Sequence, residues 1–456
     1  MPKKKKALTI EERLQQALVP AEEQPYEVPE NWVWVRLGEV NKYVSKSVNP
    51  ISEPDKIFEL YSVPSMADDY PEIIAGSDIG SSKQSVCKED VLLCKINPRI
   101  NRVWKVSQFT DNELIASSEW IIIRNNHINA NYLMYCFQSK YFREFMLSNV
   151  SGVGGSLMRA QPKYVQTYPI PLPPLSEQQR IVERIEELFA KLDEANERLQ
   201  EVAESFAVRK AAILHKAFTG ELTKQWRLEN GVSDESWEEK TIGDVCTVNP
   251  KKIDAKNLDD NLEVSFVPMA AVSDVFGEIV NHEVKNLQDV RTGFTNFSEG
   301  DVIFAKITPC MENGKSAIVG PLVNDIGYGS TEFYVLRCKE ELYNKYLYHM
   351  VRNTTFRAEA KAVMTGAVGQ QRVPKTFLQE YQLLLPSLPE QHEIVRLIDA
   401  LLARERAAQQ AAEQALASID LMKKSILARA FRGELGTNKA SEASALELLR
   451  QVLAES

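Results

Sequence analysis

The sequence lacks the patterns that several large classes of protein require. Its six cysteines never fall at a CxxC spacing and its five histidines are scattered singly, so the sequence predicts no metal site. It also lacks the dense cysteines of a small disulfide-stabilised domain, which favours a reduced, cytoplasmic protein. No apolar run approaches the roughly 18 residues of a membrane helix, and the charged N-terminal segment has no apolar core of a secretory signal.

The composition of the 456 residues is that of a folded protein with about two or three domains. The net charge is −9, from 54 Lys and Arg against 63 Asp and Glu. An acidic total does not exclude binding of nucleic acid, because phosphate binding depends on local clusters of cations. The basic run Lys3–Lys6 is interpreted as a short solvated tail.

An internal repeat spans most of the chain. The segment LSEQQRIV begins at Leu175, and the similar segment LPEQHEIV begins 213 positions later at Leu388. KAFTGEL returns as RAFRGEL at the same spacing, whereas the upstream segments DVLLCKINP and DVIFAKITP lie 211 positions apart. The two copies therefore differ in length only upstream of the segments LSEQQRIV and LPEQHEIV. From these segments onward each copy has the same length, as expected where a packing register must be kept.

Each part of fixed length predicts a long helix with one apolar seam. Apolar or small residues recur in steps of three and four, as in a coiled coil, and the seam is interrupted by Arg209 in the first helix and Glu405 in the second. The seam comprises Ile181, Ile185, Leu188, Leu192, Leu199, Phe206 and Ile213 in the first helix, and Ile394, Ile398, Leu401, Ile419 and Ile426 in the second.

The length of the connection predicts that the two helices pack antiparallel. A helix from residue 181 to 213 is about 50 Å long. A parallel pair would require the chain after Gly220 to return over that distance before the second globular part begins near Trp237, which leaves no slack even in a fully extended chain. Gly220 and Gly433 suit the C-terminal caps of the two helices.

The globular parts mix strands with a few helices. The runs 91–96, 119–123, 302–307 and 332–336 are typical of strands, and 132–146 and 343–357 of helices. The predicted fold class is α+β, with two tandem globular α/β domains separated by two long antiparallel coiled-coil helices in a pseudo-twofold repeat. The predicted domains are a basic tail and helical arm (1–29), a first globular domain (30–175), a first helix (176–221), a linker (222–236), a second globular domain (237–386), a second helix (387–435) and a C-terminal helical arm (436–456).

The motifs of the common DNA-processing enzymes are absent. The tripeptide Gly314-Lys315-Ser316 ends like a phosphate loop, but Pro309 stands where that loop needs its first glycine. No Asn/Asp-Pro-Pro-aromatic motif of an amino-methyltransferase is present, and no clustered carboxylates suggest a nuclease. We therefore predict no catalytic residues in this chain.

Basic, amide-rich loops are the candidates for function in both modules. Arg and Lys can reach phosphates or guanine edges, and Asn and Gln can pair with adenine edges. Each module also carries a glycine-rich loop, at 151–159 and 365–372. The predicted DNA-binding residues are Lys95, Asn97, Arg99, Asn101, Arg102, Lys105, Arg159, Gln161 and Lys163 in the first module, and Lys306, Thr308, Asn313, Lys315, Gln370, Gln371, Arg372 and Lys375 in the second. Ordinary solvated loops are the alternative interpretation.

The motifs in combination resemble the specificity subunits (HsdS) of type I restriction-modification systems. The resemblance covers nearly the whole chain and rests on PLPPLSEQQRIVERI from Pro171, SLPEQHEIV from Ser387, the paired AF-x-G-E-L endings and the opening ENWVWVRLGEV from Glu30. It implies that the two globular domains are recognition domains, each of which reads one half of a split, asymmetric site in double-stranded DNA, while the helices set the spacer. The family has no fixed motif for its DNA-reading positions, so the resemblance assigns no individual residue.

The resemblance also implies partners and cofactors. Two DNA methyltransferase subunits would use S-adenosylmethionine, two restriction-translocase subunits would use ATP and Mg, and this chain would hold no cofactor of its own. The weakly similar amphipathic ends, 9–19 and 444–453, could then dock on the methyltransferase subunits. A coiled-coil adaptor that binds only proteins remains the competing hypothesis, and a sequence-specific DNA footprint would distinguish the two.

Overall fold

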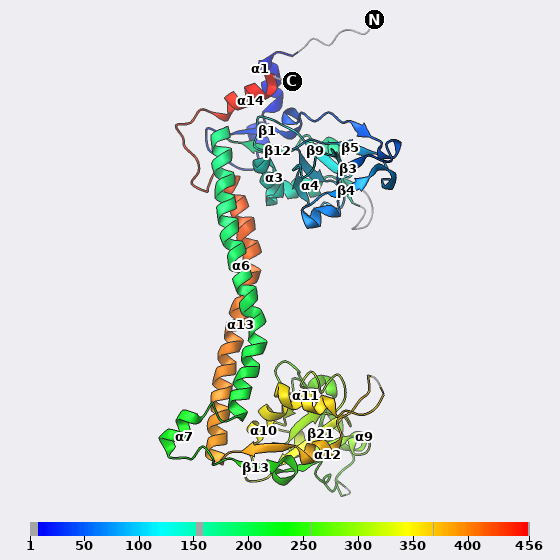
Figure 1. Ribbon diagram of the computed structural model, residues 1–456, viewed down its shortest axis with the longest axis vertical. Coiled ribbons are helices and arrows are strands. Elements are labelled where there is room, and N and C mark those ends of the chain that lie inside the picture. Colours follow the sequence, from blue (N-terminus) through cyan, green and yellow to red (C-terminus); the bar gives the residue numbers. More distant parts are fainter. Residues whose placement is uncertain (1–7, 152–157, 256, 368, 455–456) are drawn as a thin grey trace. The chain divides into compact units, whose positions relative to one another are not determined.

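The computed structural model describes residues 8–151, 158–255, 257–367 and 369–454. Its contacts divide into two compact units, of which unit 1 comprises residues 1–199 and 414–456 and unit 2 comprises residues 200–413. Two long helices, α6 (Leu175–Phe218) and α13 (Leu388–Ala430), each contribute one stretch to each unit (Figure 1). The predicted basic tail Lys3–Lys6 and residues 152–157 of the first glycine-rich loop lie outside the described residues.

Unit 1 is a mixed helix and sheet structure. Its larger sheets have the strand orders β2-β5-β8-β3-β4 and β7-β6-β9, and the pair β1-β12 joins the two ends of the first recognition domain. The strands are β1 (Val33–Arg36), β2 (Ser47–Val48), β3 (Ile57–Tyr61), β4 (Glu72–Ala75), β5 (Lys83–Ser85), β6 (Val91–Cys94), β7 (Val103–Lys105), β8 (Glu113–Ala116), β9 (Trp120–Ile123), β10 (Val150–Ser151), β11 (Arg159–Ala160) and β12 (Pro169–Leu172). The helices that lie wholly within this unit are α1 (Ile10–Ala17), α2 (Leu37–Val40), α3 (Ala130–Gln138), α4 (Lys140–Ser148), α5 (Pro162–Val165) and α14 (Ala445–Ala454).

Unit 2 repeats this plan. Its sheets have the orders β14-β21-β18-β19 and β16-β15-β20-β17, and the pair β13-β22 again joins the ends of a recognition domain. The strands are β13 (Glu238–Thr241), β14 (Cys246–Val248), β15 (Glu263–Val267), β16 (Glu283–Asn286), β17 (Thr295–Phe297), β18 (Val302–Ala305), β19 (Ser316–Ile318), β20 (Gly327–Gly329), β21 (Phe333–Cys338) and β22 (Gln382–Leu385). The shorter helices are α7 (Lys224–Asn230), α8 (Ile242–Val245), α9 (Leu287–Val290), α10 (Asn344–Val351), α11 (Thr354–Ala362) and α12 (Lys375–Glu380).

The two helices predicted at 132–146 and 343–357 are each broken into two. Ser139 separates α3 from α4 in an extended conformation, and its hydroxyl donates to the carbonyl oxygen of Cys136. Asn353 separates α10 from α11 and caps α11, because its side chain accepts from the amide of Thr355. The apolar periodicity continues across both breaks, so it predicted one helix where short polar caps begin a second.

The stretches of α6 and α13 in each unit pack antiparallel. In unit 1, Ile181 and Ile185 share a core with Leu427 and Ala430. In unit 2, Ile394 and Ile398 share a core with Leu214 and Ala217. In both cores the beginning of one long helix meets the end of the other, which confirms the predicted α+β fold with antiparallel helices.

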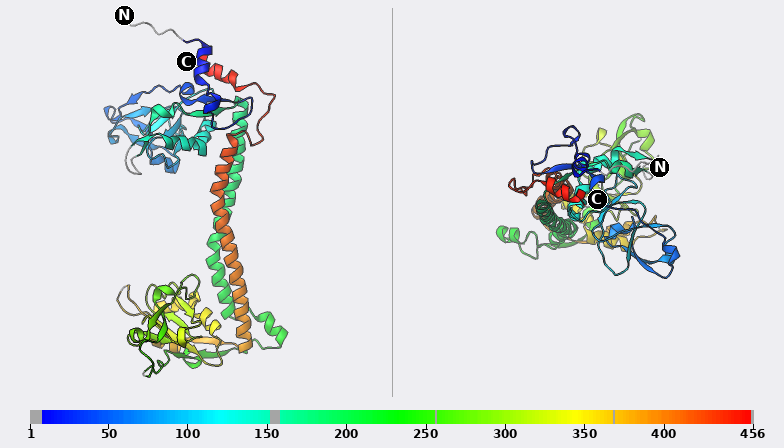
Figure 2. Two further views of the ribbon diagram at one scale, coloured as in Figure 1. Left: turned by 180° about the vertical axis from the view of Figure 1, so that it is seen from behind. Right: turned by 90° about the horizontal axis from the view of Figure 1, so that it is seen from above.

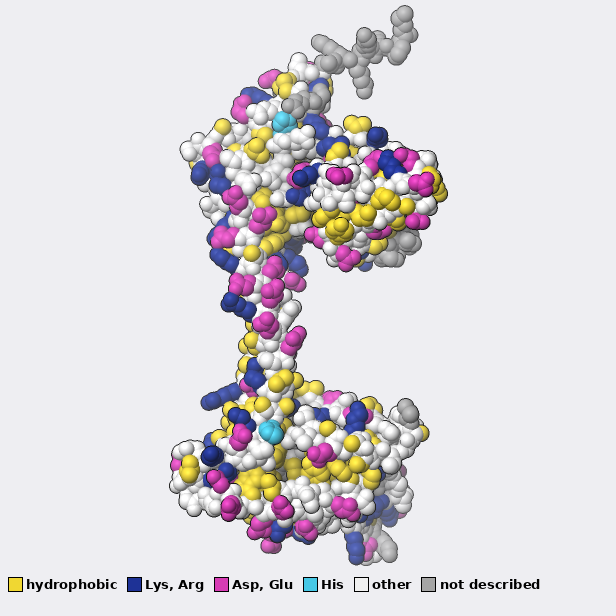
Figure 3. Space-filling view, in the orientation of Figure 1, with side chains coloured by type: hydrophobic (Ala, Val, Ile, Leu, Met, Phe, Trp, Pro, Cys, Tyr) yellow, Lys and Arg dark blue, Asp and Glu magenta, His cyan; other side chains and the backbone are white. Residues whose placement is uncertain are grey.

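Burial along the seam is greatest where each long helix begins. Ile181, Ile185, Phe206, Ile394, Ile398 and Ile419 are buried, whereas Leu188, Leu192, Leu199, Ile213, Leu401 and Ile426 are half-buried. Arg209 Nε donates to Glu405 Oε2 at 2.8 Å, so the residues that interrupt the two seams form an ion pair. Acidic and basic side chains are interspersed over the visible face of the helices (Figure 3).

The paired sequence motifs pack against each other at the ends of the helices. In unit 1, the buried carboxylate of Glu177 accepts from Trp32 Nε1 at 2.7 Å and from Asn438 Nδ2 at 2.8 Å. In unit 2, the equivalent carboxylate of Glu390 accepts from Thr223 Oγ1 and Arg227 Nη1, both at 2.7 Å. The glutamate of each LSEQ or LPEQ segment therefore lies at the start of one long helix and binds the segment that follows the other. This explains why these segments and the AF-x-G-E-L endings both occur twice at one spacing.

The two terminal arms pack together within unit 1. Arg13 Nη1 of α1 donates to the carbonyl oxygen of Leu453 in α14 at 3.0 Å, and Figure 2 shows the two helices adjacent. Leu14 and Leu449 point into the core of the unit. The apolar faces of both arms are thus already covered, so they offer little apolar surface to a partner subunit. Within the described residues, no helix combines the length and apolar character needed to cross a bilayer.

Candidate nucleic-acid interface

The first basic loop (residues 95–105) leaves the buried strand β6 and returns as β7. At the start of β6, Asp90 is 1% exposed and forms a two-bond ion pair with Arg124, with distances of 2.7 and 2.6 Å. At its end, the amide of Lys95 donates to the carbonyl oxygen of Glu119, and the amide of Ala160 donates to that of Lys95. The basic loop and the chain after the glycine-rich loop, which are far apart in the sequence, are thereby joined.

The second basic loop (residues 306–316) has the same frame. Asp301 forms a two-bond ion pair with Arg337 at 2.8 and 2.7 Å at the start of β18. The amide of Lys306 donates to the carbonyl oxygen of Glu332, and the amide of Val373 donates to that of Lys306. Two segments predicted separately to bind DNA therefore meet in both modules.

An ion pair closes this junction in each module. Arg159 contacts Glu119 through two nitrogens at 3.3 Å, and Arg372 contacts Glu332 through two nitrogens at 2.9 and 2.7 Å. The Arg372 guanidinium lowers the pKa of the Glu332 carboxyl group. Burial lowers the pKa of Lys306, and the positive charge of Arg372 adds to this effect. Arg159 and Arg372 are therefore partly neutralised and anchor the loops.

Several predicted DNA-binding side chains have partners within the protein. Lys95 Nζ donates to the carbonyl oxygen of Ser118 at 2.6 Å, and Lys105 Nζ lies 3.5 Å from Glu89 Oε1. The remaining side chains with such contacts are Asn101 (to the Gln138 oxygen and from Arg143), Lys163 (over the Tyr164 ring), Thr308 (bonded to Gln371) and Lys315 (Nζ to the Met269 oxygen). Asn97 and Arg102 bond through the main chain, the Asn97 amide to the Met158 oxygen and the Arg102 oxygen to the Cys94 amide, and the buried side-chain oxygen of Asn97 has no hydrogen-bond partner in the described ranges.

Other predicted side chains remain available to a ligand. Arg99, Asn313, Gln370 and Lys375 are exposed, and their side chains have no hydrogen bond or ion pair within the described part of the chain. Gln161 and Gln371 are half-buried, and their side chains have no such bond in the described ranges either. We regard these residues as the better candidates for contacts with bases, because the anchoring residues are already bonded.

Sequence reasoning missed two arginines that hold the basic loops. Arg143 of α4 donates to the carbonyl oxygen of Pro98, and Arg357 of α11 donates to that of Glu312 at 2.6 Å. Burial lowers the pKa of Arg143 to about 10, and burial together with the positive charge of Arg352 lowers that of Arg357. The signal was present, because both follow a phenylalanine in equivalent helices, 214 positions apart.

No cluster of potential metal ligands occurs among the described residues. In each module, the basic loop that follows β6 or β18 is joined to the chain after the glycine-rich loop. We call this pair of joined loops a loop platform. Such platforms can present cations, amides and hydroxyls to an extended ligand, and phosphate and base edges of DNA require those groups.

Comparisons with known proteins agree with this geometry. A family model described as type I restriction modification DNA specificity domain matches residues 29–204 and 234–415, one match in each repeat. The Type I restriction enzyme EcoEI specificity subunit of Escherichia coli is 32% identical over 260 residues, which cover 48% of this chain and 43% of that protein. The EcoAI specificity subunit of Escherichia coli is 35% identical over 236 residues, which cover 50% of this chain and 38% of that protein. The matched part therefore spans about two fifths of the length of these relatives.

A solved structure supports the fold over a larger part of the chain. The HsdS subunit from Thermoanaerobacter tengcongensis has a TM-score of 0.66 to this chain at 22% identity, and the match covers 90% of this chain and 99% of that chain. A structure described under complex assembly and conformational transition of the type I R-M system also has a TM-score of 0.66, at 21% identity. Because the family model matches most of the chain in two copies, the chain belongs to the type I restriction-modification DNA specificity family.

Proposed function

We propose that this chain is the DNA-reading subunit of a type I restriction-modification complex. Each recognition domain reads one half of a bipartite, asymmetric site in double-stranded DNA, and the helices set the spacer between the halves. The chain itself performs no catalysis. Two methyltransferase subunits with S-adenosylmethionine and two restriction-translocase subunits with ATP and Mg supply the chemistry in the cytoplasm.

The repeated loop platform is the observation that carries this proposal. The same backbone bonds join a basic loop to the chain after a glycine-rich loop in both modules, at Lys95 and at Lys306. The exposed groups on the platforms differ, with Arg99 in one and Asn313 in the other. Two similar frames with different exposed side chains suit the reading of two unlike half-sites.

The proposal is tested by co-expressing the chain with its methyltransferase subunit and mapping methylated adenines in the host genome. We expect a two-part sequence with a fixed gap, which is absent without this chain. A stable complex that adds no methylation, and that protects no two-part site in a footprint, would favour the adaptor hypothesis instead.

Two substitutions then test which domain reads which half. Arg99→Ala is expected to relax the sequence preference in one half-site only, and Asn313→Ala in the other only, each by about 1–3 kcal/mol if it removes a base contact. Lys224→Ala, on the exposed helix α7 away from both loops, is the control and should leave both halves unchanged. Binding to duplexes with a single altered half-site measures the effect. Equal effects of both loop substitutions on both halves would contradict separate reading.

A further inference from the structure

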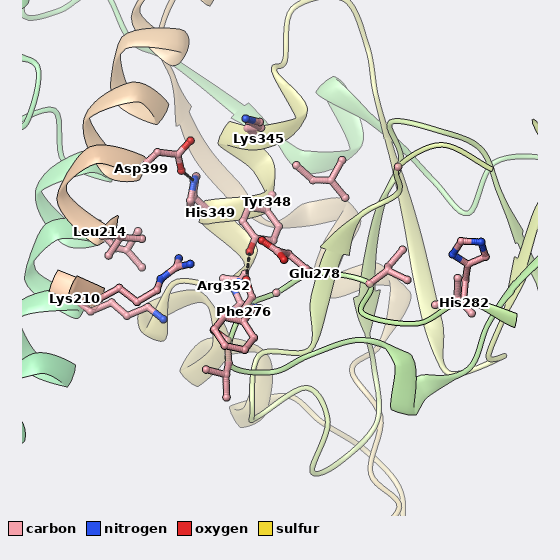
Figure 4. A pocket seen from close by; sticks show the side chains of 18 of the residues that line it. Lys210, Leu214, Phe276, Glu278, His282, Lys345, Tyr348, His349, Arg352 and Asp399 are labelled. Carbon is pink, nitrogen blue, oxygen red and sulfur yellow. Dashed lines mark hydrogen bonds and ion pairs between the residues drawn. The ribbon is translucent and has the colours of Figure 1, made fainter. Parts of the chain in front are cut away.

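A cavity of about 620 Å³ lies within unit 2, between the helix pair and the recognition domain (Figure 4). Lys210 reaches it from α6, Arg406 from α13, and Lys345 and Arg352 from α10. Tyr348, His349 and the segment 275–279 complete much of the wall. Its size is that of a pocket for a ligand as large as a nucleotide.

The cavity is lined by more cations than acids. None of its four cations, Lys210, Lys345, Arg352 and Arg406, forms an ion pair within the described ranges. Two acids, Glu278 and Asp399, line the cavity. Oδ1 of Asp399 lies 3.0 Å from His349 Nε2, and this hydrogen bond, together with the positive charges of Lys345 and Arg406, lowers the pKa of Asp399.

Arg352 is held by backbone carbonyls, which fix its position but leave its charge. Nη1 donates to the carbonyl oxygen of Gly314 at 2.8 Å, and Nη2 donates to that of Asp274 at 2.9 Å. The loop can approach this closely because Gly277 has a φ of 68°, and a Cβ there would lie 2.1 Å from the Tyr348 hydroxyl. The guanidinium is therefore preorganised at the wall of the cavity.

The cations lie close enough to repel one another. Removal of water lowers the pKa of Lys210, and the positive charges of Arg352, Arg357 and Arg406 lower it further. Cations that outnumber the acids around them attract an anion, since its arrival relieves the repulsion between them.

Arg352 links the wall of the cavity to the second basic loop. Arg352 binds the carbonyl oxygen of Gly314, Arg357 binds that of Glu312, and both acceptors belong to that loop. A nucleic-acid strand bound to the loop would lie next to Arg352, whereas a free small anion needs no such link between the loop and the cavity.

The counterparts in unit 1 of the two helix cations neutralise each other. Adding or subtracting the repeat spacing of 213 matches Lys210 to Lys423 and Arg406 to Asp193. Lys423 Nζ donates to Asp193 Oδ1 at 2.5 Å, so these two charges cancel. The excess of cations is thus a property of unit 2 and does not follow from the repeat.

We propose that this cavity binds the phosphodiester backbone of DNA beside the half-site read by the second recognition domain, through Lys210 and Arg406 from the helices and Arg352 from α10. The inference rests on the proposed function. It adds a contact that positions the duplex without reading its sequence, and it makes the two flanks of the site unequal.

The test compares two double variants of the full chain assembled with its methyltransferase subunit. K210Q/R406Q removes two of the proposed phosphate contacts. K216Q/R404Q removes two positive charges from positions on the same helices that are equally exposed but do not line the cavity. Binding to a duplex that carries the mapped site is measured over a series of salt concentrations. For K210Q/R406Q we expect an affinity about tenfold lower near 0.1 M salt and a slope of log affinity against log salt that is smaller by about two.

Each outcome decides a different point. Equal losses in the two variants, or an unchanged slope in K210Q/R406Q, would overturn the cavity proposal while wild-type specificity upholds the proposed function. A wild-type complex without any sequence preference would instead refute the proposed function. Saturable binding of a mononucleotide to the DNA-free complex, lost in K210Q/R406Q whose DNA affinity is unchanged, would assign the cavity to a small anion. Phosphate-ethylation interference next to the second half-site only, lost in K210Q/R406Q, would support the proposal directly.

Discussion

Glu332 and Arg372 form the stronger of the two ion pairs that close the loop platforms. Their two contacts are 2.9 and 2.7 Å long, against 3.3 Å for both contacts of Arg159 with Glu119. The Glu332 side chain is 24% exposed, so solvent screens the pair only in part. The second loop should therefore be held more rigidly than the first.

The lowered pKa of Glu332 predicts a pH-dependent contribution to stability. A carboxyl group whose pKa is lower in the folded state stabilises the protein above its ordinary value of 4.5, and this contribution disappears as the pH falls through the folded-state pKa. Glu332→Gln should therefore lower the stability of unit 2 at pH 7 by up to about 1 kcal/mol, and by much less near pH 3. Thermal unfolding of both proteins at the two pH values measures the difference. An equal loss at both would contradict this account.

At the scale of elements, the starts of α6 and α13 each contain a buried glutamate, and the two glutamates have different hydrogen-bond partners. Glu177 and Glu390 are both fully buried and begin equivalent helices. Glu390 is neutralised by Arg227, whereas the hydrogen bonds that Glu177 accepts come from the neutral groups of Trp32, Asn438 and Thr437. Burial accordingly raises the pKa of Glu177, because its charge has no directly bonded cation.

This difference predicts unequal effects of the same substitution. Glu390→Gln leaves the buried Arg227 with only the exposed Asp234 as a charged partner and should destabilise unit 2 by about 3–5 kcal/mol. Glu177→Gln removes no ion pair and should cost about 1–2 kcal/mol in unit 1. Thermal unfolding at pH 7 measures both, and Glu183→Gln, an exposed position in α6, is the control. A larger loss for Glu177→Gln than for Glu390→Gln would refute the explanation.

The sequence predicted the long helices well and the site less well, for physical reasons. The apolar seam repeats locally, so Ile181 and Ile394 could be assigned to it without knowledge of tertiary contacts. Lys210 and Arg406 lie outside the seam and were indistinguishable from solvated surface residues. Only folding brings them to Arg352, which is far away in the sequence. Arg143 and Arg357 were likewise missed, although both follow a phenylalanine at equivalent places in the repeat, because the backbone carbonyls that they bind cannot be identified from the sequence.

At the scale of the whole molecule, the constant length of the helical part predicts that it controls the spacer. Four residues inserted into α6 near Glu197 add about 6 Å of helix, so the gap between half-sites should widen by about two base pairs while both halves stay the same. Methylation mapping of the inserted chain reads out the gap. A four-residue insertion between Asn230 and Ser236, in the connection that follows α7, is the control. An unchanged gap after the α6 insertion would rule out spacing by the helices.

The basic loops are held by hydrogen bonds to main-chain atoms, and this has a consequence for the evolution of new DNA specificities. Arg143 and Arg357 grip backbone oxygens, and the strand ends are tied by backbone amides at Lys95 and Lys306. Every amino acid has a main-chain carbonyl oxygen, so substitutions at exposed loop positions such as Arg99 and Asn313 leave the hydrogen bonds that hold the loops unchanged. The scaffold of each basic loop can therefore stay the same while its exposed side chains vary. Natural selection or a randomised library can reach new DNA targets by changing these side chains, with little loss of folding stability.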